Sequence, residues 1–277
     1  MTNPLGTERT FEEAIEAELV GGPAGPARPG GFAEEQEPFD AGGGAPAHAL
    51  NAPGEGGYRR RDPENFDADR ALDPETLFSF IMTTQPKTWS HLRTQYGDQE
   101  VKGRVLARID REIGRRGVLD VLRNGVKDVG ARIHLAYFKP AHGLNEETAR
   151  LYRANVFQVM RQVRFNPETA QSVDLVVLLN GVPLFTAELK SPMNGQSVED
   201  AIWQYKKDRS NKHTLFHHGR CLAHFAVDPE YAYMTTKLEG KKTNFLPFNR
   251  GNQGGAGNPP VRTDYATAYL WRDVWRP

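Results

Sequence analysis

The sequence predicts an α/β (or α+β) fold in which a mixed β-sheet is flanked by helices. Segments with helical periodicity precede a Val- and Leu-rich hairpin, and two more helices and two more strands follow it. Of the 277 residues, 38% are hydrophobic, which is enough for one sizeable core and a second small unit. A chain that alternates between these two periodicities builds a sheet covered by helices.

The composition limits the functional classes. Lys plus Arg and Asp plus Glu number 35 each, so any surface for nucleic acid must be local. Cys221 is the only cysteine, which excludes an internal disulfide and a Cys-rich zinc site and favours a reducing compartment. The sequence has neither a signal-peptide pattern nor an apolar run long enough to span a membrane. We therefore expect a cytoplasmic protein without a membrane partner.

Three regions are predicted along the chain. Residues 1–20 form an N-terminal helix that packs on the core, with Phe11, Ile15 and Leu19 recurring every four residues. Thr10 and Glu13 fit a capping box that would start this helix. Residues 21–57 are rich in Gly and Pro, which predicts a disordered insertion. Residues 58–277 are predicted to form the main globular domain.

Within the main domain, periodicity separates helices from strands. The segments that predict helices are 72–92 with a break at Gln85–Pro86, 99–117, 145–163, 198–209 and 264–275. The segments that predict strands are 172–180, 182–189, 221–228 and 230–236. The dipeptide Asn180–Gly181 separates the first two strands and is typical of a hairpin turn.

This hairpin, VDLVVLLNGVPLFTAELKSP (173–192), carries charges at the ends of its apolar strands. Asp174 and Glu188 lie fourteen positions apart, and two carboxylates can hold a hard cation such as Mg2+. Lys190 follows two residues later on the same strand face. Metal-held carboxylates beside a lysine suit phosphodiester hydrolysis, because the lysine can orient a water or stabilise negative charge.

The proposed site sets a condition on the strand register. A two-residue loop at Asn180–Gly181 pairs Leu179 with Val182, which would place Asp174 and Glu188 on opposite faces. A loop one residue longer, or a β-bulge, would pair the two acids directly, and Pro183 beside the turn favours such an irregularity. Spacing alone favours the ordinary alternative, in which these charges are solvated strand ends or an ion pair.

The same residues resemble the PD-(D/E)xK nuclease signature, with Asp174 followed by Glu188-Leu189-Lys190 and with Val173 in place of the usual proline. The surrounding sequence resembles the N-terminal region of the R (restriction) subunit of type I restriction endonucleases. The segments that carry this resemblance, in the same order, are TQPKTW, GVLDVLRNGVKD, AYFKPAHGLN, the hairpin, HFAVD, MTTKLEGKKTNFLPFNRG and YLWRDVW.

The resemblance implies a PD-(D/E)xK restriction-endonuclease-like core with Mg2+ as cofactor. Asp174 and Glu188 would be metal ligands, the Leu189 backbone carbonyl would be a third ligand, and Lys190 would be the catalytic lysine.

A helix after the catalytic strand carries a Gln in this family, usually with a Tyr four residues later. Gln204 matches the first position, but Asp208 occupies the second and the tyrosine is Tyr205, so a role near metal or DNA is expected for Gln204 rather than Tyr205. Glu13 is a further candidate acid, although its role in a capping box would explain it fully.

The function implied is a Mg2+-dependent endonuclease domain that cuts double-stranded DNA. In this family, cleavage depends on an ATP-driven, helicase-like motor and on modification (M) and specificity (S) subunits. The chain contains no G-x-x-x-x-G-K-[ST] phosphate loop, so ATP would act only through motor domains absent from it. We expect a fragment, a truncated gene product or a split subunit. The alternative is a non-catalytic DNA-binding or subunit-docking remnant.

A local basic region adds a candidate DNA surface. The segment 102–132 holds more Lys and Arg than Asp and Glu, and Arg115 and Arg116 are its candidate phosphate contacts. A solvated helix face is the alternative explanation.

Overall fold

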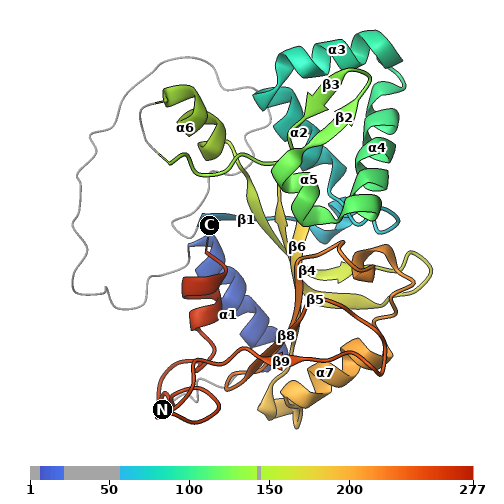
Figure 1. The fold of residues 1–277 in the computed structure, drawn as a ribbon. Coiled ribbons are helices and arrows are strands. Elements are labelled where there is room, and N and C mark those ends of the chain that lie inside the picture. The colour runs from blue at the N-terminus through green and yellow to red at the C-terminus, as the bar shows by residue number, and fades with distance from the viewer. Residues whose placement is uncertain (1–6, 22–56, 142–144, 277) are drawn as a thin grey trace.

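The computed structural model describes residues 7–21, 57–141 and 145–276. A seven-stranded mixed sheet stands between helices that cover both of its faces, so the predicted fold class is confirmed (Figure 1). The α-helices of the described residues are α1 (Glu8–Val20), α2 (Pro74–Thr84), α3 (Pro86–Tyr96), α4 (Val101–Arg116), α5 (Val118–Asn124), α6 (Glu146–Arg153) and α7 (Val198–Lys207).

The strands run in the order β1-β4-β5-β6-β7-β8-β9, and β2 pairs with β3 in a separate hairpin. Their bounds are β1 (Tyr58–Arg60), β2 (Val126–Asp128), β3 (Ala131–Ile133), β4 (Phe157–Arg164), β5 (Ser172–Leu179), β6 (Val182–Leu189), β7 (Ala223–Val227), β8 (Ala232–Thr235) and β9 (Leu246–Pro247). The pairs β1/β4 and β6/β7 are parallel and the other neighbours are antiparallel. The central hairpin β5–β6 therefore has a neighbouring strand at each edge, β4 beside β5 and β7 beside β6.

Two helices pack on opposite faces of the sheet. On one face, Phe11, Ile15 and Leu19 of α1 join a core with the apolar side chains of β5 and β6, as the four-residue spacing predicts. On the other face, Val198, Ala201 and Tyr205 of α7 join a second core with apolar side chains of β4, β5 and β7, and α7 lies against β6 and β7. Figure 1 shows α1 (blue) and α7 (orange) on either side of the strands. Both helices reach the end of the hairpin that lies away from its turn.

A helical layer made of α2–α5 and the β2–β3 hairpin packs at the turn of the β5–β6 hairpin (Figure 1). Leu179 and Val182, on either side of the turn, belong to the core of this layer. The carbonyl of Gly181 accepts a hydrogen bond from the Asp73 backbone N–H at 2.8 Å. The turn is therefore fixed by a layer separate from α1 and α7.

Three predicted helices have different bounds. The helix predicted over 145–163 ends at Arg153, and its second half is β4, because Phe157–Arg164 is rich in alternating apolar residues that pair with β5. The helix predicted over 264–275 is confined to a short π-helix at Leu270–Val274. Helix α1 begins at Glu8, because Thr7 caps it by accepting a hydrogen bond from the Thr10 N–H, so the predicted Thr10–Glu13 capping box is wrong.

Two further predictions concern the Gly- and Pro-rich insertion at 21–57 and the absence of a membrane-spanning segment. Most of the predicted insertion, residues 22–56, lies outside the described residues. Among the described residues, no helix is long and apolar enough to cross a membrane.

Candidate metal centre

A bulge in the hairpin sets the register of the predicted acids. Leu179 pairs with Val182 across a two-residue turn, but Val177 pairs with Phe185, so Leu184 is an extra residue on β6. Leu175 then pairs with Ala187, and the same register one step further places Asp174 opposite Glu188. The turn alone would have paired Asp174 with Ala187. The bulge is the second of the two arrangements that the sequence left open.

The turn has the left-handed backbone that an Asn–Gly hairpin requires. Asn180 and Gly181 have φ of 53° and 81°. A Cβ at Gly181 would lie 2.3 Å from the Asp73 carbonyl oxygen, so only glycine fits this close approach. The Asn180 side chain accepts from the Val156 N–H and donates to the Leu135 carbonyl, at 2.7 and 2.8 Å. These contacts hold the hairpin at its closed end.

At the open end of the hairpin, Asp174 is buried and its two carboxylate oxygens accept different hydrogen bonds. Oδ2 accepts from the Leu189 backbone N–H at 2.7 Å, and Oδ1 accepts from the Gln162 amide at 3.1 Å. Each carboxylate oxygen has two lone pairs, so both retain a lone pair for a cation. Asp174 is thereby oriented by β6 and by β4.

Helix α1 brings two more carboxylates to Asp174. One oxygen from each of Glu8, Glu12 and Asp174 lies within 4.8 Å of the other two, which is a spacing that could hold a metal ion. Burial, with the charge of Asp174 as a second cause, raises the pKa of Glu12 to about 7. The same causes raise the pKa of Glu8. A cation at this cluster would offset the repulsion between the three acids.

Glu188 is fully buried and only half paired. The Arg209 guanidinium donates to its Oε1, whereas Oε2 has no hydrogen-bond partner among the described residues. Burial raises the pKa of Glu188 well above its usual value, with the charge of Asp174 next in importance and Arg209 opposing both. An unpaired carboxylate oxygen in the interior is costly, and a cation is one partner that would satisfy it.

Lys190 lies at the end of β6 with its side chain buried against α1. Its ammonium group is 3.3 Å from Oε1 of Glu8, and its backbone N–H donates to the Val227 carbonyl at 2.9 Å. The predicted lysine therefore lies beside the acid cluster, through Glu8. The backbone of Leu189 also lies beside the acid cluster, because its N–H donates a hydrogen bond to Asp174.

Three further residues were considered from the sequence, Gln204 and Tyr205 on α7 and Glu13 on α1. Tyr205 is fully buried and hydrogen-bonds Thr186 at 2.7 Å, and burial raises its pKa, with Glu188 as the next cause. Gln204 is half-buried and makes no side-chain hydrogen bond within the described part of the chain. Glu13 is partly exposed and pairs with Arg9 at 2.9 Å. Of these three residues, Tyr205 is the one that lies near Glu188.

The predicted DNA contacts on α4 are engaged in ion pairs. Arg115 and Arg116 both bind Glu112, at 2.8 and 2.9 Å. Arg116 also donates to the Gly125 carbonyl and is largely buried, whereas the side chain of Arg115 is 67% exposed. Helix α4 belongs to the layer at the turn of the hairpin, so neither arginine lies at the acid cluster.

The described residues fit a divalent cation. Oxygen donors are what Mg2+ prefers, and the cluster supplies carboxylates from α1 and β5, with the unpaired Oε2 of Glu188 on the neighbouring strand. Glu8, Glu12 and Asp174 form the group of carboxylates that could hold a metal ion, and Glu188, which Arg209 binds, is not in that group. The structure thus brings Asp174 and Lys190 to one cluster and adds two acids from the N-terminal helix.

Sequence reasoning missed Glu8, Glu12 and Arg209. A signal existed for the first two: Glu8, Glu12 and Glu16 recur every four residues, and like charges at this spacing destabilise a helix unless cations offset them. Arg60 and Arg161 form ion pairs with Glu16, and Arg161 also forms an ion pair with Glu12. No local pattern pointed to Arg209, because its partner lies on another element.

Two comparisons with known proteins bear on the family of this chain. A search of curated proteins finds no match to the chain. Residues 57–243, more than half of the chain, match the family described as type I restriction enzyme R protein N terminus. The matched range includes the whole bulged hairpin, Lys190 and Arg209. The chain therefore belongs to the family formed by the N-terminal region of type I restriction enzyme R proteins.

Proposed function

We propose that this chain is the Mg2+-dependent endonuclease domain of a type I restriction-modification R subunit and hydrolyses DNA phosphodiester bonds. The observation that carries the proposal is the bulge at Leu184, because it places Asp174 opposite Glu188 and leaves Lys190 at the end of the same strand. A β-bulge next to an active site commonly redirects a side chain in this way.

The roles follow from the contacts. Asp174 would hold the cation with Glu8 or Glu12, and Glu188 would add its free oxygen. When bound, a divalent cation polarises a phosphoryl oxygen and lowers the pKa of a water. Lys190, freed from Glu8, would orient the attacking water or stabilise charge on the phosphate. Gln204 and the Leu189 carbonyl remain proposed contributors.

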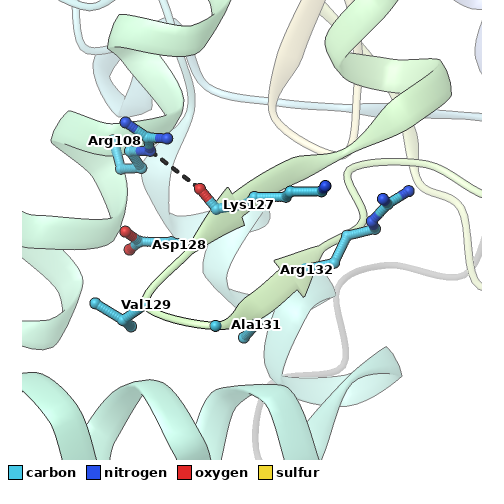
Figure 2. Close-up of a pocket in the computed structure, with 7 residues that line it drawn as sticks. Arg108, Lys127, Asp128, Val129, Ala131 and Arg132 are labelled. Carbon is cyan, nitrogen blue, oxygen red and sulfur yellow. Dashed lines mark hydrogen bonds between the residues drawn. The ribbon is translucent and has the colours of Figure 1, made fainter.

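The structure also offers a surface for the DNA backbone. Lys127 on β2 lies directly opposite Arg132 on β3, and both side chains are exposed. Like charges directly opposite in a β-ladder are destabilising unless an anion lies between them. Figure 2 shows both side chains extending from the hairpin beside a pocket of about 630 Å³, where Arg108 donates to the Lys127 carbonyl. We propose that Lys127 and Arg132 contact DNA phosphates.

Partners and location follow from the family rather than from a contact in the structure. We propose that the domain acts in the cytoplasm on double-stranded DNA, together with M and S subunits and an ATP-driven motor. ATP would bind only in that motor.

The test is nicking of supercoiled plasmid by the chain with Mg2+, alone and with the motor segment added. Lys190→Ala should lose cleavage, whereas Lys207→Ala, an exposed lysine at the end of α7, should retain it. Equal cleavage by wild type and Lys190→Ala refutes the assignment.

A non-catalytic module is the second candidate, and one observation favours it. Arg209 neutralises Glu188 and Glu8 neutralises Lys190, so the charges are partly balanced without a metal. Duplex binding without cleavage, even after the motor segment is added, would support this candidate.

A further inference from the structure

Two consecutive side chains of β4 converge on the same carboxylate. Arg161 donates to Oε2 of Glu12 at 3.1 Å, and Gln162 donates to Oε1 of Glu12 at 2.8 Å. In a regular strand, successive side chains point to opposite faces of the sheet. Both can therefore reach Glu12 only where the strand departs from regular geometry.

The departure lies at Gln162 itself. Its φ is 52°, in the left-handed region that residues with a Cβ rarely adopt and that is unusual inside a strand. Its neighbours Arg161 and Val163 pair normally with β5, on Leu175 and Val173, so the irregularity is confined to one residue opposite Asp174. Gln162 is exposed, so burial of its side chain does not account for this backbone. Backbone strain of this kind gathers at functional sites.

The Gln162 amide joins two acids of the cluster. Its Nε2 donates to Oε1 of Glu12 at 2.8 Å and to Oδ1 of Asp174 at 3.1 Å. Its own Oε1 accepts from the Ser172 hydroxyl at 2.8 Å. Because the hydroxyl bonds the amide oxygen, it fixes which end of the amide faces the acids. One neutral side chain thus uses both of its N–H groups on carboxylates from α1 and β5.

We propose that Gln162 is a positioning residue for a divalent cation at Glu12 and Asp174, held in place by its left-handed backbone and by Ser172. The inference rests on the proposed metal site. Gln162 occupies one lone pair on an oxygen of each acid and leaves another on the same oxygen for a cation. It also offsets part of their repulsion without adding a charge that would compete with the cation. Hydrogen-bond partners of metal ligands commonly set affinity in this way.

The test measures Mn2+ binding to the full chain by isothermal titration calorimetry, with urea unfolding of the same samples. Gln162→Leu and Gln162→Gly both remove the amide, but only glycine also relieves the backbone strain. Both variants should weaken Mn2+ binding by about 10- to 100-fold. The glycine variant should have the higher urea midpoint of the two.

Two more variants separate positioning from general stability. Ser172→Ala should weaken binding by a smaller factor, because the amide keeps its donors but loses its fixed orientation. Gln171→Ala, an exposed glutamine nearby, should bind Mn2+ as wild type does.

Each outcome bears on the inference. If wild type binds Mn2+ and both Gln162 variants bind equally well, the inference is overturned while the metal site stands. If the Mn2+ affinities of the variants instead rank as their urea midpoints do, and Gln162→Gly binds nearly as tightly as wild type, the role of Gln162 is structural only. If wild type does not bind Mn2+, the proposed metal site fails, and the positioning role fails with it.

Discussion

The two ends of the β5–β6 hairpin differ in the groups that surround them, which are neutral at the turn and charged at the open end. At the turn, Asn180 and Gly181 are held by neutral backbone amide and carbonyl groups of Asp73, Leu135 and Val156. At the open end, Asp174 and Glu188 are buried beside further charges, and Oε2 of Glu188 lacks a hydrogen-bond partner in the part of the chain that the structure describes. The turn end is organised for stability and the open end for binding, because buried like charges cost stability unless a ligand offsets them.

The largest effect is expected at the open end. Asp174→Asn should reduce Mg2+-dependent nicking by at least about 1000-fold, because a catalytic metal contributes several kcal/mol and each ~1.4 kcal/mol is a factor of ten. The free energy of unfolding should change by only about 1 kcal/mol, since asparagine can still accept from Leu189 and removes one repulsive charge, while its amide nitrogen loses the hydrogen bond from Gln162. Plasmid nicking and urea unfolding measure the two quantities. Asp208→Asn, an exposed acid, is the control for both.

The turn end should show the reverse pattern. Gly181→Ala should cost about 3 kcal/mol of unfolding free energy, because alanine at φ 81° is strained and its Cβ meets the Asp73 carbonyl. Gly195→Ala has a similar φ of 69° with open space around the Cβ, so it should cost only about 1 kcal/mol. Urea unfolding of both variants separates clash from strain. Equal losses would mean that the close approach at the turn contributes nothing.

His224, a buried neutral side chain near the open end, makes the free energy of unfolding depend on pH. Burial lowers the pKa of His224, whose Nδ1 lies 2.8 Å from the Thr186 hydroxyl, to about 3. Its pKa in the unfolded chain is near 6.5, so the unfolded state binds more protons below that pH and stability falls as pH drops from 6.5 toward 3.

Between pH 7 and pH 5 this residue should cost about 2 kcal/mol. His224→Gln should flatten that part of the pH–stability curve, whatever its stability at pH 7. Urea unfolding at several pH values measures the slope, and an unchanged slope would contradict the role assigned to His224.

The smallest effect concerns DNA contacts far from the hairpin's open end. Lys127→Ala with Arg132→Ala should reduce the salt slope of duplex binding by roughly 2, at about one unit per lost phosphate contact. The matched pair Arg115→Ala with Arg116→Ala should change it less, because Glu112 already binds both arginines. The reverse ranking would return the contact surface to α4, as the sequence suggested.

Local patterns in the sequence predicted the hairpin well. Asn180–Gly181 and the flanking apolar residues identify two strands and a turn, because both signals involve neighbours in the chain. The same reasoning was wrong for Phe157–Arg164, where helical periodicity continued into a segment that becomes a strand by pairing with β5.

The candidate site was only half visible in the sequence. Asp174, Glu188 and Lys190 lie within one motif, whereas Glu8 and Glu12 meet Asp174 only because α1 packs on the sheet. Likewise, nothing local to Leu184 locates the bulge there. Pro183 lacks a ladder N–H and favours an irregularity, but its position depends on how β6 fits its neighbours.

The bulge at Leu184 also changes which residue separations along the chain can face each other across the hairpin. In a regular hairpin with a two-residue turn, directly opposed residues are always an odd number of positions apart. Asp174 and Glu188 are separated by an even number, fourteen, so one unpaired residue is an arithmetic necessity for them to face each other. Deletion of Leu184 would leave the two acids an odd number of positions apart, so a regular hairpin with the same turn would pair them without a bulge, whereas closing the bulge with Leu184 present would pair Asp174 with Ala187. In this fold, the count of residues between two carboxylates is itself a part of the site.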